Sequence, residues 1–229
     1  MSAAANSLPQ AAPGPDVLGL LLHSVSQPLT SLRCSLEMEL ENSEKSSFRE
    51  TAKRRQETVV KALQQTENVI GMIQLMREYL DAENPGPEIG WAALSPILRR
   101  IVDDFESIAA VRGIELMIVG DASARLPMSE AHLRKGLQYL IASAIDAHAP
   151  GGEITLHLEE NATETVLAIK GEEPQAGRRE FLPEIPTLGK VRLAIASRVF
   201  EAAGESLAIG GRAGDYVLRI PRRASSLVR

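Results

Sequence analysis

The amino-acid sequence predicts an α+β protein: an N-terminal helical hairpin that forms a dimeric four-helix bundle, followed by an α/β sandwich. Two long segments, 16–41 and 48–82, carry apolar residues at alternating spacings of four and three, the period of helices packed along a partner helix. The stretch 83–90, with two prolines and two glycines, ends this pattern and is typical of a linker. Beyond it, helical periods alternate with short runs of branched apolar residues, which indicate mixed helix and strand.

Composition narrows the class of protein. The 229 residues are 44% hydrophobic and carry a net charge of −5, which gives no electrostatic reason to expect nucleic acid. Aromatic residues make up only 3%, too few for base-stacking platforms. The single cysteine, Cys34, excludes an internal disulfide and fits a reducing, cytoplasmic compartment. No apolar run approaches the roughly 20 residues that span a bilayer, so no membrane contact is expected.

The first helix carries an apolar seam and, beside it, a polar stripe. The seam consists of Leu18, Leu22, Val25, Leu29, Leu32 and Leu36. His23 lies off this seam, on a stripe with Ser26, Gln27 and Thr30 at helical spacing. Pro28 follows within the helix and removes the N–H that would bond the carbonyl of Ser24. Since a proline inside a helix costs about 3 kcal/mol, its place near an exposed histidine suggests a purpose, such as letting the helix bend.

The second helix completes the hairpin. Its seam is Val59, Leu63, Thr66, Ile70 and Ile73, and the polar stretch 42–47 is short enough to be a turn. One hairpin cannot bury both seams, so we predict that two copies pair as a homodimer. The alternative is a hairpin that packs on its own C-terminal part. The basic run Lys53, Arg54 and Arg55 is interpreted as a solvated face, with a contact to an acidic partner as the alternative.

The remaining elements follow in order. We expect a helix over 95–111 ended by Gly113, a strand over 114–119, and a helix over 129–147 capped by Ser129. Strands over 153–158 and 165–170 flank a turn that holds Asn161, a last helix covers 188–203, and a hairpin of 207–209 and 216–220 closes the sheet. The predicted plan is a disordered leader 1–15, a hairpin domain 16–82, a linker 83–90, an α/β domain 91–223 and a tail 224–229.

Several motifs resemble bacterial two-component histidine kinases over residues 16–222. The run His-Ser-Val-Ser-Gln-Pro-Leu-Thr at 23–30 resembles their phospho-acceptor box. Leu-Ile-Ala-Ser-Ala-Ile at 140–145, Ala-Pro-Gly-Gly-Glu-Ile at 149–154 and the helix 193–204 resemble their ATP-binding domain. The resemblance implies that His23 is the phospho-acceptor and catalytic residue.

The departures from that pattern affect the nucleotide site. Ser143 stands where the resemblance implies an asparagine that helps hold magnesium, and Gly171 stands where it implies an aspartate that reads adenine. The resemblance implies that Leu188, Lys190 and Arg192 replace glycines of the phosphate loop. We interpret the two basic residues as exposed at a helix start, with attraction of an anion as the alternative. We therefore expect a degenerate ATPase domain that does not bind ATP.

The acceptor box departs as well. Ser24 replaces the acidic residue that usually follows the histidine, while Gln27 leaves phosphatase activity open. An acceptor histidine beside a degenerate domain resembles the kinase-derived histidine phosphotransferases of bacterial phosphorelays. The resemblance implies that His23 takes a phosphoryl group from one response-regulator receiver domain and passes it to another, with the degenerate domain as a docking surface.

The resemblance also implies that this chain binds no cofactor or metal and that Mg²⁺ is on the receiver. Two alternatives stay open: an ATP-dependent histidine kinase with a divergent pocket, and a non-catalytic pseudokinase scaffold. The other histidines, His132, His148 and His157, lack metal-ligand spacing with one another or with Cys34 and are interpreted as structural or surface residues.

Overall fold

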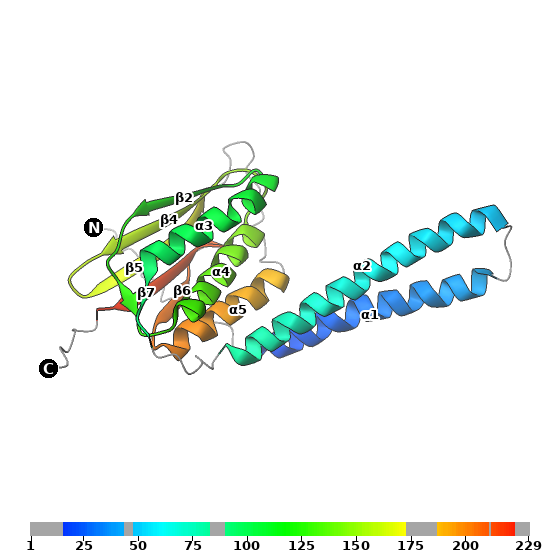
Figure 1. The fold of residues 1–229 in the computed structure, drawn as a ribbon, viewed down its shortest axis with the longest axis horizontal. Helices are drawn as coiled ribbons and strands as arrows, with labels where there is room; N and C mark the ends of the chain where they lie inside the picture. The colour runs from blue at the N-terminus through cyan, green and yellow to red at the C-terminus, as the bar shows by residue number, and fades with distance from the viewer. Residues whose placement is uncertain (1–15, 44–47, 83–89, 173–186, 211, 223–229) are drawn as a thin grey trace, which may run out of the picture. The chain divides into compact units, whose positions relative to one another are not determined.

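The computed structural model describes residues 16–43, 48–82, 90–172, 187–210 and 212–222 (Figure 1). These residues form two compact units, one ending at Leu80 and the other beginning at Asp81. The predicted leader, the residues 44–47 of the predicted turn, nearly all of the predicted linker and the predicted tail lie outside the described residues.

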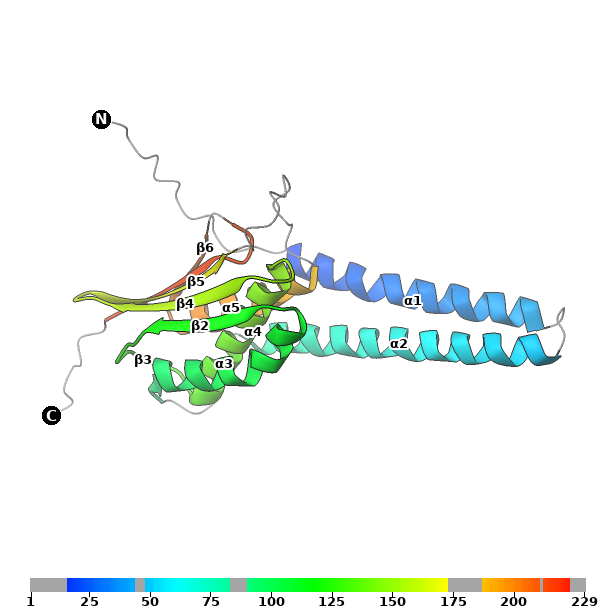
Figure 2. The same ribbon diagram turned by 90° about the horizontal axis from the view of Figure 1, so that it is seen from above.

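The first unit is a helical hairpin. Helices α1 (Asp16–Ser43) and α2 (Phe48–Asp81) lie side by side and run antiparallel (Figures 1 and 2). Both helices were predicted from the spacing of their apolar residues, and their ends differ from the prediction by one or two residues. Helix α1 continues through Pro28. The side chains of Ser26 and Thr30 donate hydrogen bonds of 2.8 Å to the carbonyls four residues earlier, a pattern that often bends helices.

The predicted seams divide into two stripes. On α1, Val25 and Leu32 are half-buried, whereas Leu22, Leu29 and Leu36 are exposed. On α2 the same division recurs: a half-buried stripe consists of Ala62, Val69 and Met76, and an exposed stripe consists of Val59, Leu63, Ile70, Ile73 and Leu80. A single hairpin therefore leaves a long row of large apolar side chains uncovered.

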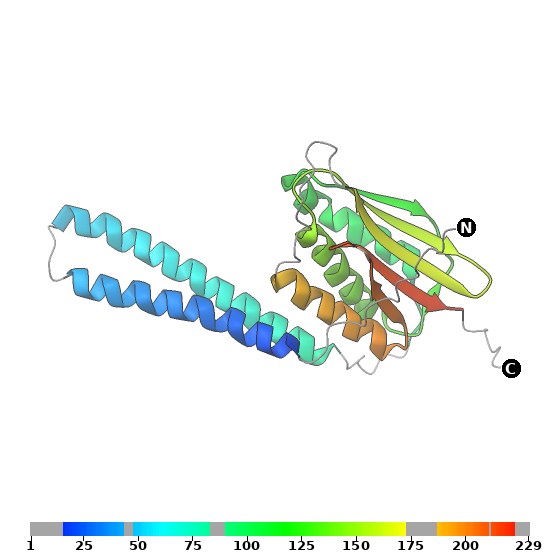
Figure 3. The ribbon, with the colours of Figure 1, turned by 180° about the vertical axis from the view of Figure 1, so that it is seen from behind.

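The second unit is a sheet covered by helices on one face (Figures 1 and 2). Its helices are α3 (Leu94–Val111), α4 (Glu130–Ala147) and α5 (Thr187–Ala202). Its strands are β2 (Glu115–Gly120), β4 (Glu153–Glu160), β5 (Glu164–Glu172), β6 (Ser206–Ile209) and β7 (Tyr216–Pro221), in the order β2-β4-β5-β7-β6. Strand β2 is parallel to β4 and the other pairs are antiparallel. Figure 3 shows this sheet from behind, with β7 in red between β5 and β6.

Local signals set the ends of these elements as predicted. The Ser129 side chain accepts a hydrogen bond of 3.2 Å from the His132 N–H and caps α4. Gly113, with φ +67°, ends α3 and donates to the Ala110 carbonyl at 2.9 Å. Two further strands, β1 (Ala92–Ala93) and β3 (Arg125–Leu126), pair antiparallel and were not predicted. With two residues each, they are too short to carry a period.

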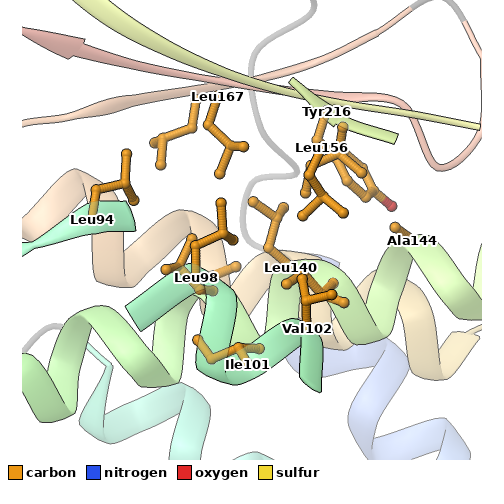
Figure 4. Packing of buried hydrophobic residues seen from close by; sticks show 14 of the residues in the cluster. Leu94, Leu98, Ile101, Val102, Leu140, Ala144, Leu156, Leu167 and Tyr216 are labelled. Carbon is orange, nitrogen blue, oxygen red and sulfur yellow. The ribbon is translucent and has the colours of Figure 1, made fainter. Parts of the chain in front are cut away.

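The core lies between the helices and the sheet (Figure 4). Leu94, Leu98 and Ile101 of α3 and Leu140 of α4 are fully buried and pack in one cluster with side chains of the strands, including Tyr216. Each such apolar side chain stabilises the folded state by about 1.5–3 kcal/mol. This core fixes α4 and the ends of β5 and β7, which carry Ser143, Gly171 and Tyr216.

Candidate functional site

His23 lies on the exposed face of α1. Its side chain is exposed, as are those of Ser26, Gln27 and Thr30 on the same stripe and of the neighbouring Leu22. The following residue is Ser24, which offers no carboxylate to serve as a base. The imidazole is therefore accessible to a partner, and chemistry that needs a neighbouring carboxylate must obtain it from elsewhere.

Ser143, at the position where the resemblance implies a magnesium-holding asparagine, forms hydrogen bonds within the protein. It is buried on α4, and its hydroxyl donates a hydrogen bond of 2.9 Å to the carbonyl of Gly189 on α5. The same oxygen lies 2.8 Å from the hydroxyl of Tyr216 on β7, a second hydrogen bond. Burial raises the pKa of Tyr216 to about 12, although the bond to Ser143 acts in the opposite direction. This group joins α4, α5 and the sheet.

Gly171, at the position of the implied adenine-reading aspartate, faces the imidazole of His148. A Cβ added at Gly171 would overlap this ring, since even the ring atom Nδ1 would lie only 2.5 Å away. A Cβ added at Gly214 would lie 3.4 Å from the same nitrogen, so the buried ring packs close to two glycines. The Arg112 side chain donates a hydrogen bond of 2.8 Å to the His148 carbonyl, which helps fix the end of α4. Any side chain at position 171 would have to displace the imidazole.

An ion-pair network joins the two helices near this point. The Arg192 guanidinium of α5 donates to the carboxylate of Asp146 on α4, and Arg112 lies 3.7 Å from the same carboxylate. The interpretation of Lys190 and Arg192 as exposed was wrong, because both side chains are half-buried. Packing of α5 along α4 places position 192 opposite Asp146, a register that the local sequence does not encode.

These residues do not fit the ATP-binding pattern that the kinase resemblance implies. The imidazole of His148 occupies the space in front of Gly171, where an aspartate would begin. The hydroxyl of Ser143 is bonded to protein atoms, and Arg192 is paired with Asp146. The described residues hold no group of three or more histidine, cysteine and acidic side chains placed to share a metal ion.

The remaining candidates lie apart from this group. His132 is half-buried at the start of α4, and burial lowers its pKa, while a hydrogen bond with the Ala82 backbone raises it and the nearby Lys135 lowers it further. His157 is half-buried on β4, and Cys34 is exposed on α1. The side chains of the basic run 53–55 lie outside the described residues. The contact between His148 and Gly171 was missed, and the only signal in the sequence was a glycine directly after the predicted strand 165–170.

Solved structures show which fold this is. The histidine kinase AdeS of Acinetobacter baumannii matches with a TM-score of 0.58 at 15% identity, over 88% of this chain and 98% of that chain. The histidine kinase ThkA, solved in complex with the response regulator protein TrrA, matches with a TM-score of 0.62 at 17% identity, over 91% and 61% of the two chains. Full-length ShkA, in complex with AMPPNP, matches with a TM-score of 0.51 at 19% identity, over 89% and 46%.

The chain therefore has a histidine kinase-like fold, with a helical N-terminal part and an α/β part like the kinase ATPase domain, as predicted. No protein-family model and no curated protein sequence matches it. Among the helices within the described ranges, none is long and apolar enough to cross a membrane.

Proposed function

We propose that this protein is a histidine phosphotransferase of a two-component phosphorelay, which carries phosphoryl groups between response-regulator receiver domains on His23 and does not use ATP. One observation carries the proposal: the imidazole of His148 fills the space in front of Gly171, while the imidazole of His23 stays exposed. On this proposal, the chain keeps an accessible acceptor while an imidazole fills the position that the kinase resemblance assigns to adenine recognition. The complex of the structural neighbour ThkA with a response regulator supports a receiver as the partner.

In the proposed transfer, this chain supplies the imidazole of His23. A ring nitrogen of the neutral His23 imidazole attacks the phosphorus of an aspartyl phosphate, and the P–O bond to the receiver carboxylate breaks as the P–N bond forms. The released carboxylate stays on the first receiver, and the proton on the other ring nitrogen stays on the imidazole. A carboxylate of a second receiver then attacks the phosphorus and releases neutral imidazole. Mg²⁺ bound by the receiver would supply charge neutralisation for the oxygens of the phosphoryl group.

The hairpin supplies a surface on which such transfer can be organised. We include a homodimer in the proposal because the exposed seam runs along both helices, from Leu22 to Leu36 on α1 and from Val59 to Leu80 on α2. Pairing two hairpins would bury these stripes in a four-helix bundle. The polar stripe with His23 lies off the seam and would remain open to a receiver. Pro28 lies five residues after His23 and would ease bending of α1 when a receiver docks.

Labelled ATP separates this proposal from the kinase alternative. The full chain and its His23→Ala variant are incubated with ATP that carries a radiolabelled γ-phosphate, and the protein-bound label is measured. We expect no label on either protein. Incorporation that disappears in His23→Ala would mean that the domain still uses ATP, and the kinase alternative would replace the proposal.

A phosphorylated receiver separates it from the scaffold alternative. A panel of receiver domains is loaded with radiolabelled acetyl phosphate, freed of the reagent and mixed with the full chain. We expect label on the wild-type chain and none on His23→Ala, while the control His157→Ala is labelled like the wild type. Equal absence of label from all three proteins with every receiver would favour a scaffold.

A further inference from the structure

A concave site lies in the α/β unit, apart from the group formed by Ser143, His148 and Gly171. It is a cavity of about 750 Å³ formed by the residues before α3, the start of α3, strand β3 and the start of α4. Its residue Glu130 and Ser143 lie thirteen residues apart on α4, which corresponds to about 20 Å along the helix. The cavity is therefore separate from the group around His148.

The walls of the cavity combine one aromatic face with two guanidinium groups. Trp91, the only tryptophan of the chain, lines it and is 53% exposed. Arg125 of β3 and Arg100 of α3 also line the cavity. Arg125 is the strand partner of Ala93, which lies two residues after Trp91. Tryptophan offers a planar face for stacking, and arginine recognises phosphate and carboxylate groups through paired N–H donors.

The charges leave one cation available for a ligand. Arg100 lies 3.5 Å from the carboxylate of Glu130, an exposed pair of small energetic value. Arg125 makes no ion pair with any residue in the described part of the chain. Two guanidiniums and one carboxylate therefore give the cavity a net charge of +1. The Glu130 carboxylate can accept hydrogen bonds from amino or hydroxyl groups of a ligand.

Two buried apolar side chains line part of the cavity. Ile97 and Met128 line it and are only 5% and 3% exposed, and the turn before Met128 is fixed by a 2.8 Å hydrogen bond from its N–H to the Leu126 carbonyl. The cavity therefore combines apolar side chains with a mostly polar, charged lining, and a hollow of several hundred cubic ångströms with convergent polar groups is within the size range of small-molecule sites.

We infer that the cavity beside Trp91 binds a small ligand that joins a planar ring to an anionic group, of the class of the nucleoside monophosphates. The ring stacks on the exposed indole, the phosphate pairs with Arg125, and Glu130 accepts hydrogen bonds from the sugar or the base. This inference does not rest on phosphotransfer by His23, so either can fail without the other.

The single tryptophan makes the test direct. The full chain is titrated with GMP and with AMP while Trp91 fluorescence is recorded, and heat release is measured by calorimetry in parallel. We expect a saturable change with at least one of the two nucleotides and weaker binding of guanosine and of inorganic phosphate, which each lack one half of the ligand. Trp91→Phe should weaken binding in the calorimeter.

Two matched arginine variants decide the site. Arg125→Gln removes the cation in the cavity and should weaken binding about tenfold or more. Arg99→Gln removes an exposed arginine of α3 that pairs with Asp121 and does not line the cavity, and it should change affinity by no more than about twofold. The inference is overturned if neither nucleotide binds at millimolar concentration, if both variants bind like the wild type, or if inorganic phosphate binds as tightly as the nucleotides.

Discussion

Replacing Gly171 by alanine introduces a methyl group where the imidazole of His148 lies. The added Cβ would overlap the ring atom Cε1, so the ring would have to move, and in its buried position it can do so only by displacing its neighbours. His148 is buried, and its backbone is held by Arg112. Overpacking of this kind costs about 1–3 kcal/mol, and more where the surroundings cannot move. We expect Gly171→Ala to lie at the upper end of this range.

The assay is urea unfolding followed by Trp91 fluorescence, which reports on the α/β unit. With a slope of about 2 kcal/mol per molar urea, a loss of about 3 kcal/mol lowers the midpoint by about 1.5 M. Gly90→Ala is the matched control, because its Cβ would meet only the Met128 carbonyl oxygen, at 3.9 Å. That variant should change the free energy of unfolding by less than about 1 kcal/mol.

A double-mutant cycle tests the cause. In a His148→Ala background the ring is gone, so Gly171→Ala should cost less than about 0.5 kcal/mol, and the coupling energy between the two sites should exceed about 1.5 kcal/mol. The reasoning is refuted if Gly171→Ala leaves the midpoint unchanged, or if it costs the same amount with and without the imidazole.

Three further predictions concern other residues. Burial raises the pKa of Tyr216 from 10.0 to about 12, so the phenol ionises first in the unfolded state. The free energy of unfolding should therefore fall as the pH rises from 10 to 12, and Tyr216→Phe should remove this fall. Tyrosinate absorbance should show one titration near pH 12. Burial lowers the pKa of His132 from 6.5, so the imidazole takes up a proton first in the unfolded state. The free energy of unfolding should therefore decrease as the pH falls through 6.5. NMR titration of His132 should show a midpoint below 6.5, and a midpoint above it would contradict the burial argument. Leu63→Glu places a charge on the exposed seam and should convert a homodimer to monomers in light scattering, whereas Gln64→Glu should not; a wild-type monomer would refute the bundle.

Local features of the fold could be predicted from the sequence. The two hairpin helices could be predicted because their apolar residues recur every 3.5 residues along the whole segment. The start of α4 could be predicted because the Ser129 side chain accepts a hydrogen bond from the backbone N–H three residues later. Such signals lie within a few residues of the structure they specify. The two-residue strands β1 and β3 carry no such signal, so only the structure shows them.

Contacts between distant segments could not be predicted. Asp146 and Arg192 are 46 residues apart, and their ion pair depends on the register between α4 and α5, which the local pattern does not specify. The sequence showed Gly171 only as a missing aspartate, whereas the structure shows an imidazole in front of it. The cavity beside Trp91 could not be predicted either, because the two arginines that line it come from β3 and α3, which are distant from Trp91 in the sequence or lie on another element.

The central claim is tested most directly by following one phosphoryl group through both steps without nucleotide. A radiolabelled, phosphorylated receiver is mixed with the full chain and a second, unphosphorylated receiver, and the label on each protein is measured over time. The account predicts that label passes transiently through the chain in acid-labile form and reaches the second receiver, and that His23→Ala abolishes both. Transfer between receivers that persists in His23→Ala, or a chain that is labelled only when ATP is present, would contradict it.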